Sequence, residues 1–280
     1  MLQVETDLAI FIEKVRPHLE NNSSINSIVL SVLNRFIKSN KPLTFLGTTS
    51  EIVGIQTNNE NPLILSHCFE KDAQYFAEEL FKLKIKIPGV NSTAFASDAF
   101  AKTWCRLSGQ TMKIGMNIRL YELTKVIFPQ QVSGNCRLAT SFDESILFDW
   151  YKRYCEEALP SDPLPADEMI LKTIRQNIAD QNYYLWEDHG QTISWVGSSR
   201  ETKRERWIAP VYTPKHFRGK GHASALVAEV SQTILNKSKV ALLTTNLANP
   251  TSNSIYQKIG YKPLTDFRHW IFEEKAEPKA

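Results

Sequence analysis

The chain has 280 residues, of which 42% are hydrophobic and 22% are charged, a balance that excludes a disordered protein and suits about two globular domains. Thirty-three basic and thirty acidic side chains leave a net charge of +3, which is too small an excess for a dedicated nucleic-acid-binding protein. Cys68, Cys105, Cys136 and Cys155 lack the spacing of a zinc site or a disulfide framework. We therefore expect reduced thiols and no metal.

Targeting and membrane segments are not expected from the sequence. Charged residues interrupt the first twenty positions, which does not fit a signal peptide, and no apolar run reaches the ~20 residues that cross a bilayer. These observations predict a cytoplasmic protein with no membrane partner.

In the first half of the chain, hydrophobic spacing predicts two helices, then strands, then helices again. The expected helices cover residues 8–19, 25–37, 71–86 and 97–107, and the expected strands cover residues 43–46, 51–57, 62–66 and 112–122. Residues 128–135 contain Pro, Gly, Ser and two Gln with few apolar residues, which is typical of a linker. We therefore predict an N-terminal domain over residues 1–130 and a C-terminal domain over residues 134–280.

The second half alternates helices and strands. The expected helices cover residues 143–159, 166–179, 223–234 and 250–259, and the expected strands cover residues 183–187, 191–197, 206–213, 239–245 and 267–272. Helices interleaved with strands in this way indicate an α/β fold rather than an all-α or all-β fold.

A basic, glycine-containing loop joins a predicted strand to a predicted helix near residues 211–224. Gly219 and Gly221 let the backbone approach a ligand closely, and the N-terminus of the following helix favours phosphate. Arg218 and Lys220 add positive charge. Because the spacing matches neither a Walker A loop nor GxGxxG, these residues alone leave open both a phosphate site and an ordinary solvated turn.

This loop resembles the signature [Q/R]-x-x-G-x-[G/A] of the GNAT superfamily of acyl-CoA-dependent N-acyltransferases, which follows a bulged strand. The resemblance implies the GNAT fold, a central mixed and mostly antiparallel sheet flanked by helices, with acetyl-CoA as co-substrate. It implies that the pantetheine arm lies along the strand and the pyrophosphate binds the loop. The implied contacts are Val211, Tyr212 and Thr213 on the strand, then Arg218, Gly219, Lys220, Gly221, His222 and Ala223 in the loop, with Ser224 beside them.

A second stretch, residues 249–261, is similar to the family pattern N-x-x-[A/S]-x-x-x-Y-x-x-x-G-[F/Y]. Asn249, Asn253 and Tyr256 are three or four residues apart, so they share one helix face. The resemblance implies that this face looks at the cofactor and that the Tyr256 hydroxyl acts as general acid near the thioester sulfur. A tyrosine whose ring only packs in the core is the alternative.

The first half of the chain carries no such loop. Its order of elements, two helices followed by strands and another helix, nevertheless looks like a degenerate copy of the same unit. The sequence therefore predicts a tandem arrangement with a degenerate first copy. Residues 88–91, which precede a helix, could be the remains of the loop, although they lack the cation and the second glycine. An unrelated α/β cap domain is the alternative.

The resemblance implies an N-acetyltransferase that transfers an acyl group, in the first instance acetyl, from acyl-CoA to a primary amine by direct attack in a ternary complex. The acceptor would be the amine of a small molecule or peptide, with no nucleic-acid partner, and the protein would be a monomer or homodimer. The alternatives are a non-catalytic acyl-CoA-binding module and a protein that uses the loop for another nucleotide.

The residues do not assign a general base. Glu187, Asp188 and Glu205 lie in or beside predicted strands, but each is more often an ordinary solvated carboxylate. Nearby tryptophans fit either a substrate pocket or the core. We expect the charged residues 200–206 to form a solvated hairpin.

Overall fold

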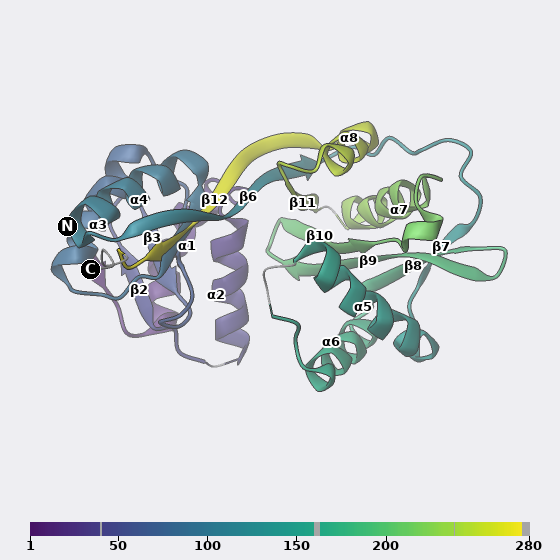
Figure 1. Ribbon diagram of the computed structural model, residues 1–280, viewed down its shortest axis with the longest axis horizontal. Helices are drawn as coiled ribbons and strands as arrows, with labels where there is room; N and C mark the ends of the chain where they lie inside the picture. The colour runs from purple at the N-terminus through teal and green to yellow at the C-terminus, as the bar shows by residue number, and fades with distance from the viewer. Residues whose placement is uncertain (40, 160–162, 238, 276–280) are drawn as a thin grey trace, which may run out of the picture. The chain divides into compact units, whose positions relative to one another are not determined.

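The computed structural model describes residues 1–39, 41–159, 163–237 and 239–275, and it divides into two compact units (Figure 1). The first unit contains Met1–Tyr121, Thr244–Pro250 and Pro263–Ala280, and the second contains Glu122–Leu243 and Thr251–Lys262. The units are therefore not two consecutive stretches of chain, as the predicted boundary after residue 130 assumed. The last strand returns to the first unit.

The first unit is a sheet covered by helices on both faces. Its elements are β1 (Gln3–Val4), α1 (Leu8–Glu20), α2 (Ser27–Ser39), β2 (Phe45–Thr48), β3 (Val53–Gln56), β4 (Leu63–Leu65), α3 (Glu70–Lys82), β5 (Gly89–Thr93), α4 (Ala94–Ser108), β6 (Thr111–Leu123) and β12 (Lys262–Glu273). One apolar cluster joins α1 and α2 to Leu46 and Ile55, and another joins α3 and α4 to Phe45, Leu63 and Val90. Because side chains alternate along a strand, Phe45 and Leu46 enter opposite layers.

The second unit has the same layered form. Its elements are β7 (Asn135–Leu138), a 3₁₀ turn (Ser141–Asp143), α5 (Glu144–Ala158), α6 (Asp167–Ala179), β8 (Tyr183–Asp188), β9 (Gln191–Glu201), β10 (Glu205–Tyr212), a 3₁₀ turn (Lys215–Phe217), α7 (His222–Asn236), β11 (Val240–Asn246) and α8 (Pro250–Ile259). Helices α5 and α6 cover one face of β7–β10, around the fully buried Trp195, and α7 covers the other (Figure 1).

The two units share one order of elements and one pattern of strand pairing. In each, a strand and two helices precede three strands, and a helix, a strand and a further helix follow. In each, three antiparallel pairs are followed by one parallel pair, β4 with β5 in the first unit and β10 with β11 in the second. This repetition favours the hypothesis that the first unit is a second copy of the same fold.

Most predicted elements agree with the structure, and three differences are informative. Strands β1 and β7 were missed because two to four residues are too few for alternation to be visible. The helix predicted to reach residue 86 ends at Lys82, since Lys84 takes a positive φ of 55°. The predicted loop remnant at residues 88–91 is wrong, because these residues end the α3–β5 connection and begin β5, and α4 follows β5 directly.

Candidate functional site

Strand β10 contains a β-bulge. Its register with β9 shifts between Ile208 and Val211, so the two residues between them interrupt the regular ladder. Gly197 on β9 faces this point, and a Cβ there would lie 2.6 Å from the carbonyl oxygen of Ala209. The strand that precedes the predicted loop is therefore bulged, as the sequence resemblance implied.

Strands β10 and β11 are paired only at their starts. The parallel ladder joins Glu205 to Val240 and ends where Trp207 meets Leu242, and the described part of the chain contains no further pair between these two strands. Strand β10 continues to Tyr212 beyond the last pair. Its final residues therefore have main-chain groups that β11 does not use, on the side where a ligand could bind along the strand.

The loop between β10 and α7 has the backbone geometry of a phosphate-binding turn. Gly219 and Gly221 have φ angles of +81° and +84°, a conformation that L side chains rarely adopt. Gly221 is the N-cap of α7, and no side chain caps this helix end. The first N–H groups of a helix have no acceptor within the helix, so the N-terminus of α7 offers donors and the positive end of its dipole.

Arg218 is tied to the strand and to helix α5. Its Nε donates to the carbonyl oxygen of Thr213 at 2.7 Å, and its Nη2 donates to Oε2 of Glu157 at 2.7 Å. The guanidinium lies 5.8 Å from the centre of the Tyr212 ring. The side chain thus fixes the beginning of the loop, although the resemblance had implied only that Arg218 belongs to the phosphate site.

Tyr212 and Thr213 can meet a ligand mainly through their main chains. The Tyr212 side chain is only 5% exposed, packs 6.1 Å from Trp150 and donates its hydroxyl to Oε1 of Glu157 at 3.2 Å. The Thr213 hydroxyl is 2.7 Å from the hydroxyl of Ser194. These contacts hold the end of β10 in place.

His222 and Lys220 line a pocket of about 360 Å³ beside the loop. Its other walls come from the β8–β9 turn, from Phe217 and from residues 131–133. His222 is only 6% exposed, and its Nδ1 has no hydrogen-bond partner in the described structure. Ala223 and Ser224 continue the first turn of α7 and are partly buried.

Helix α8 carries Tyr256. The helix begins at Pro250, and Gly260, with a φ of +107°, follows its end, so the predicted start and stop are both confirmed. Burial, with a smaller contribution from the neighbouring Tyr154, raises the pKa of Tyr256 to about 12. The Tyr256 ring lies edge-on to Tyr261 at 6.0 Å.

The two predicted asparagines lie near Tyr256 in sequence but occupy different positions. Asn253 is in α8, three residues before Tyr256, whereas Asn249 immediately precedes the helix. The main-chain N–H of Asn249 donates to the carbonyl oxygen of Asn246 at 3.0 Å. Asn249 therefore lies at the start of α8, as expected for the residue before a first helical Pro250, and Asn253 and Tyr256 lie within the helix.

The three carboxylates considered as general bases all have partners. Glu187 accepts a hydrogen bond from Nε of Arg137 at 2.6 Å, and Asp188 accepts one from the Ser133 hydroxyl at 2.8 Å. Glu205 is only 1% exposed and is bonded to the Thr202 hydroxyl. Glu187 and Asp188 remain partly exposed, Glu205 is buried, and none of the three is assigned as a base by its contacts.

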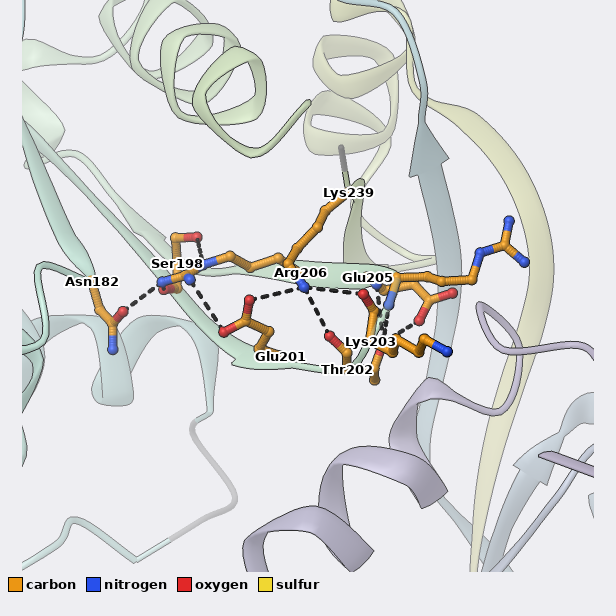
Figure 2. A network of polar contacts seen from close by, with 9 residues as sticks. Asn182, Ser198, Glu201, Thr202, Lys203, Glu205, Arg206 and Lys239 are labelled. Atoms are coloured by element: carbon orange, nitrogen blue, oxygen red, sulfur yellow. Dashed lines mark hydrogen bonds and ion pairs between the residues drawn. The ribbon is translucent and has the colours of Figure 1, made fainter. Parts of the chain in front are cut away.

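The hairpin at residues 200–206 is largely solvated, as predicted, because four of its seven residues are exposed, and hydrogen bonds from Lys239 also hold it. Figure 2 shows Lys239, immediately before β11, reaching into this turn. Its Nζ donates to the carbonyl oxygens of Thr202 and Lys203, each at 3.1 Å, and pairs with Glu201 at 3.0 Å. The turn is thus bound to the residue immediately before Val240, where the short β10–β11 ladder begins.

Arg206 extends the same network across the sheet (Figure 2). Its Nε donates to the Ser198 hydroxyl at 2.9 Å, and its Nη2 donates to Oδ1 of Asn182 at 2.6 Å. Trp207, the next residue, is 2% exposed, and Trp186 and Trp195 are buried as well. These tryptophans are therefore core residues in their own unit.

Glu157 is a residue of this site that sequence reasoning missed. It lies in the last turn of α5 and joins Arg218 to Tyr212. A signal was present, because Glu156 and Glu157 put negative charge at a helix C-terminus, where the dipole disfavours it. The hydrogen bond from Arg218 holds the pKa of Glu157 below its ordinary value, which makes this carboxylate a poor base.

The first unit has a strand-to-helix junction at the corresponding place, between β4 and α3. Residues 66–69 form it and contain no glycine, and Phe69 at its end is 69% exposed. The first turn of α3 carries Glu70 and Asp72. The Ser92 hydroxyl on β5 donates to the carbonyl oxygens of Leu65 and Ser66, each at 3.3 Å.

The described residues contain no group of three or more His, Cys, Asp or Glu side chains placed to hold a metal ion. Among the same residues, no helix combines the length and apolar character needed to span a membrane. All four cysteines are free thiols, and Cys68 and Cys155 are buried.

Comparison with known proteins shows what the fold and part of the sequence resemble. Residues 189–271 match the family model described as FR47-like protein. An acetyltransferase of the GNAT family from Colwellia psychrerythraea is 8% identical with a TM-score of 0.62, and the match covers 98% of this chain and 100% of that one. A GCN5-related N-acetyltransferase from Sphaerobacter thermophilus is 16% identical with a TM-score of 0.56, covering 82% and 80%.

A protein from Drosophila gives a similar match, with 13% identity, a TM-score of 0.64 and coverage of 97% of this chain and 98% of that one. No curated protein sequence matches the chain. At these identities, the structural likeness establishes the fold. The fold that the resemblance implied is thereby confirmed: the chain has the GNAT fold, and its residues 189–271 match the FR47-like family model.

Proposed function

We propose that the protein is an N-acetyltransferase that transfers an acetyl group from acetyl-CoA to the primary amine of a small molecule or peptide, by direct attack in a ternary complex. The observation that carries the proposal is the junction between β10 and α7. A bulged strand leads through two left-handed glycines into an uncapped helix N-terminus. The GNAT fold supports the same class of activity.

The residues of the second unit fit the proposed co-substrate, which supplies an activated thioester when bound. Val211 and Thr213 would offer main-chain groups to the pantetheine arm, on the side of β10 that β11 leaves unpaired. The main-chain N–H groups of residues 219–223 would receive the pyrophosphate. No atom lies within 4 Å of the Cβ position at Gly219, so the loop is open there. Lys215 and Lys220 are exposed and would balance the phosphate charge.

The acceptor amine must lose a proton before it attacks, because an alkyl ammonium has a pKa near ~10.4. Glu187 and Asp188 are engaged with Arg137 and Ser133, and Glu205 is buried. These contacts argue against each carboxylate as the base. The acceptor amine would therefore give its proton to water.

Tyr256 would donate a hydrogen bond to the sulfur atom that leaves the thioester. A phenol whose pKa is raised to about 12 keeps its proton at every physiological pH, so it is always a donor. A thiol has a pKa near ~8.5, so complete proton transfer from this phenol to a thiolate is uphill. Tyr256 would accordingly stabilise the leaving sulfur through a hydrogen bond, and its contribution would lie at the low end for a general acid.

A thiol-release assay with acetyl-CoA and a panel of amines tests the proposal. We expect free CoA to form only when a suitable amine is present, and the acetylated amine to form in equal amount. A non-catalytic binding module would instead bind acetyl-CoA without releasing thiol. Thermal melts with acetyl-CoA, desulfo-CoA and ATP separate both from a general nucleotide-binding protein. Stabilisation by ATP but not by desulfo-CoA would contradict the assignment of the loop.

A further inference from the structure

Glu157 occupies a position that is unfavourable for a carboxylate on its own. It lies in the last turn of α5, where the negative end of the helix dipole repels it. Its side chain is 31% exposed and reaches Arg218 at 2.7 Å and the Tyr212 hydroxyl at 3.2 Å. The contacts with the loop and the strand therefore compensate for the position within the helix.

Arg218 joins this carboxylate to the main chain of the loop. Its Nε donates to the carbonyl oxygen of Thr213, five residues earlier, while its Nη2 donates to Glu157. The first contact closes the turn between the end of β10 and Gly219. The second fixes the direction of the guanidinium plane, since two contacts on different nitrogens leave it little rotational freedom.

We propose that Glu157 is a positioning residue for the phosphate loop. It holds Arg218 against the Thr213 carbonyl and so sets where the chain enters the left-handed turn at Gly219 and Gly221. The inference rests on the proposed function in one respect, namely that this loop binds the phosphates of acetyl-CoA. Because Glu157 offsets the charge of Arg218, the exposed Lys220 would supply the charge that attracts phosphate.

The chain offers a matched control. Glu156 is the preceding residue of the same helix and is exposed, so Glu156→Gln removes the same charge at the same helix end without touching Arg218. If Glu157 merely stabilised the fold through its charge, the two substitutions would change the melting temperature alike and leave CoA binding unchanged. If Glu157 positions the loop, only Glu157→Gln changes the loop and its ligand affinity.

The first measurement is hydrogen–deuterium exchange of the free protein. In Glu157→Gln we expect faster exchange confined to residues 213–221, while Glu156→Gln matches the wild type. The second is the dissociation constant of CoA by calorimetry, which we expect to rise about 3- to 10-fold in Glu157→Gln. Unchanged exchange and unchanged affinity in Glu157→Gln would overturn the proposal, as would equal effects of the two substitutions.

A double-substitution cycle tests whether Glu157 acts through Arg218. We expect the variant Glu157→Gln/Arg218→Gln to bind CoA no more weakly than Arg218→Gln alone, because the carboxylate has nothing left to hold. If the losses of CoA affinity in the two single variants multiplied in the double variant, Glu157 would act independently of Arg218, and the proposal would be overturned. The exchange measurement uses no ligand. If the wild type bound no CoA, the proposed function would fail, and exchange would still decide whether Glu157 positions the loop.

Discussion

The two units place a strand-to-helix junction at the same point of the same topology, and the two junctions differ in length, in glycine content and in charge, although neither helix end has a side-chain cap. In the second unit, residues 213–221 form a long connection with two left-handed glycines. In the first unit, residues 66–69 run straight from β4 into α3 without a glycine. The fold thus supplies the helix N-terminus in both units, but only the second unit reaches it through a loop with left-handed glycines.

In the first unit, a side chain of the protein itself bonds to the end of strand β4. Strand β4 is paired with β5 only at Leu63 and Ile64, so this parallel ladder is also short, with two residue pairs against three between β10 and β11. Beyond this ladder, the Ser92 hydroxyl donates to the carbonyl oxygens of Leu65 and Ser66. At the end of β4, a side chain of the protein itself therefore occupies main-chain carbonyl groups.

Charge separates the two junctions further. The second carries Arg218 and Lys220 before α7, whereas the first carries Glu70 and Asp72 in the first turn of α3. Carboxylates at a helix N-terminus stabilise the helix, but they repel a phosphate. The two units thus share one topology and differ in the loop and in its charge, and under the proposed function only the second unit would bind the cofactor.

The largest effect is expected from Gly221→Val. A β-branched residue at a φ of +84° is strained, and the altered turn would displace the N–H donors of α7. We expect acetyl-CoA affinity to fall about 1,000-fold, as measured by calorimetry. Gly109→Val in the first unit is the matched control, because Gly109 has a φ of +77° and open space around it. It should reduce stability and leave affinity unchanged. Near-wild-type affinity in Gly221→Val, with the fold intact, would refute the loop assignment.

The next effect concerns Tyr256. Tyr256→Phe removes the hydroxyl and keeps the ring, so we expect kcat to fall about 100-fold while acetyl-CoA affinity barely changes. If the ring only packs against Tyr261, Phe will be silent and Tyr256→Ala will cost about 3–5 kcal/mol of stability. Turnover and melting temperature of both variants decide between these roles, and an unchanged kcat in the Phe variant would remove Tyr256 from the catalytic residues.

A smaller but direct test counts binding sites in the whole chain. We expect calorimetry to give one acetyl-CoA per protein, because Ser92 and the acidic first turn of α3 close the junction of the first unit. Two sites of comparable affinity would contradict this comparison of the junctions. The whole chain is the right sample, since cutting it near residue 130 would separate β5 from its partner β12.

The smallest expected effect is the pH dependence of the Glu157–Arg218 contact. The pKa of Glu157 is lowered from its ordinary value of 4.5, mainly by the hydrogen bond from Arg218. A lowered carboxylate pKa contributes stability above about pH 4.5 and loses it as the pH falls through the folded-state pKa. For so exposed a pair, the contribution is at most about 1 kcal/mol. The difference in melting temperature between wild type and Glu157→Gln should therefore shrink below pH 4.5, and a difference that grew would contradict the assignment.

The sequence predicted the second junction well because its signals are local. A glycine with positive φ, a helix start and a cation within six residues can be read without knowing any neighbour. The first junction was misplaced for the same reason. Gly89 resembled a loop glycine, yet it is required by packing, because a Cβ there would lie 2.3 Å from the carbonyl oxygen of Trp270. Such a contact joins residues 181 positions apart in the sequence, and no local pattern reveals it. Glu157 was missed likewise, because its partner lies 61 residues away.

Strand β12 comes late in the sequence, and this position affects how the chain folds during synthesis. Phe267 through Ile271 pair with Thr93 through Gly89, and Ser97 donates its hydroxyl to the carbonyl oxygen of Arg268. During synthesis from the N-terminus, the edge of β5 that pairs with β12 therefore stays unpaired until almost the entire remaining chain has been made. An unpaired strand edge is prone to aggregation, and contacts between such distant residues form slowly. The nascent chain would depend on chaperones through that interval, and truncation shortly before residue 262 would leave an incomplete first sheet.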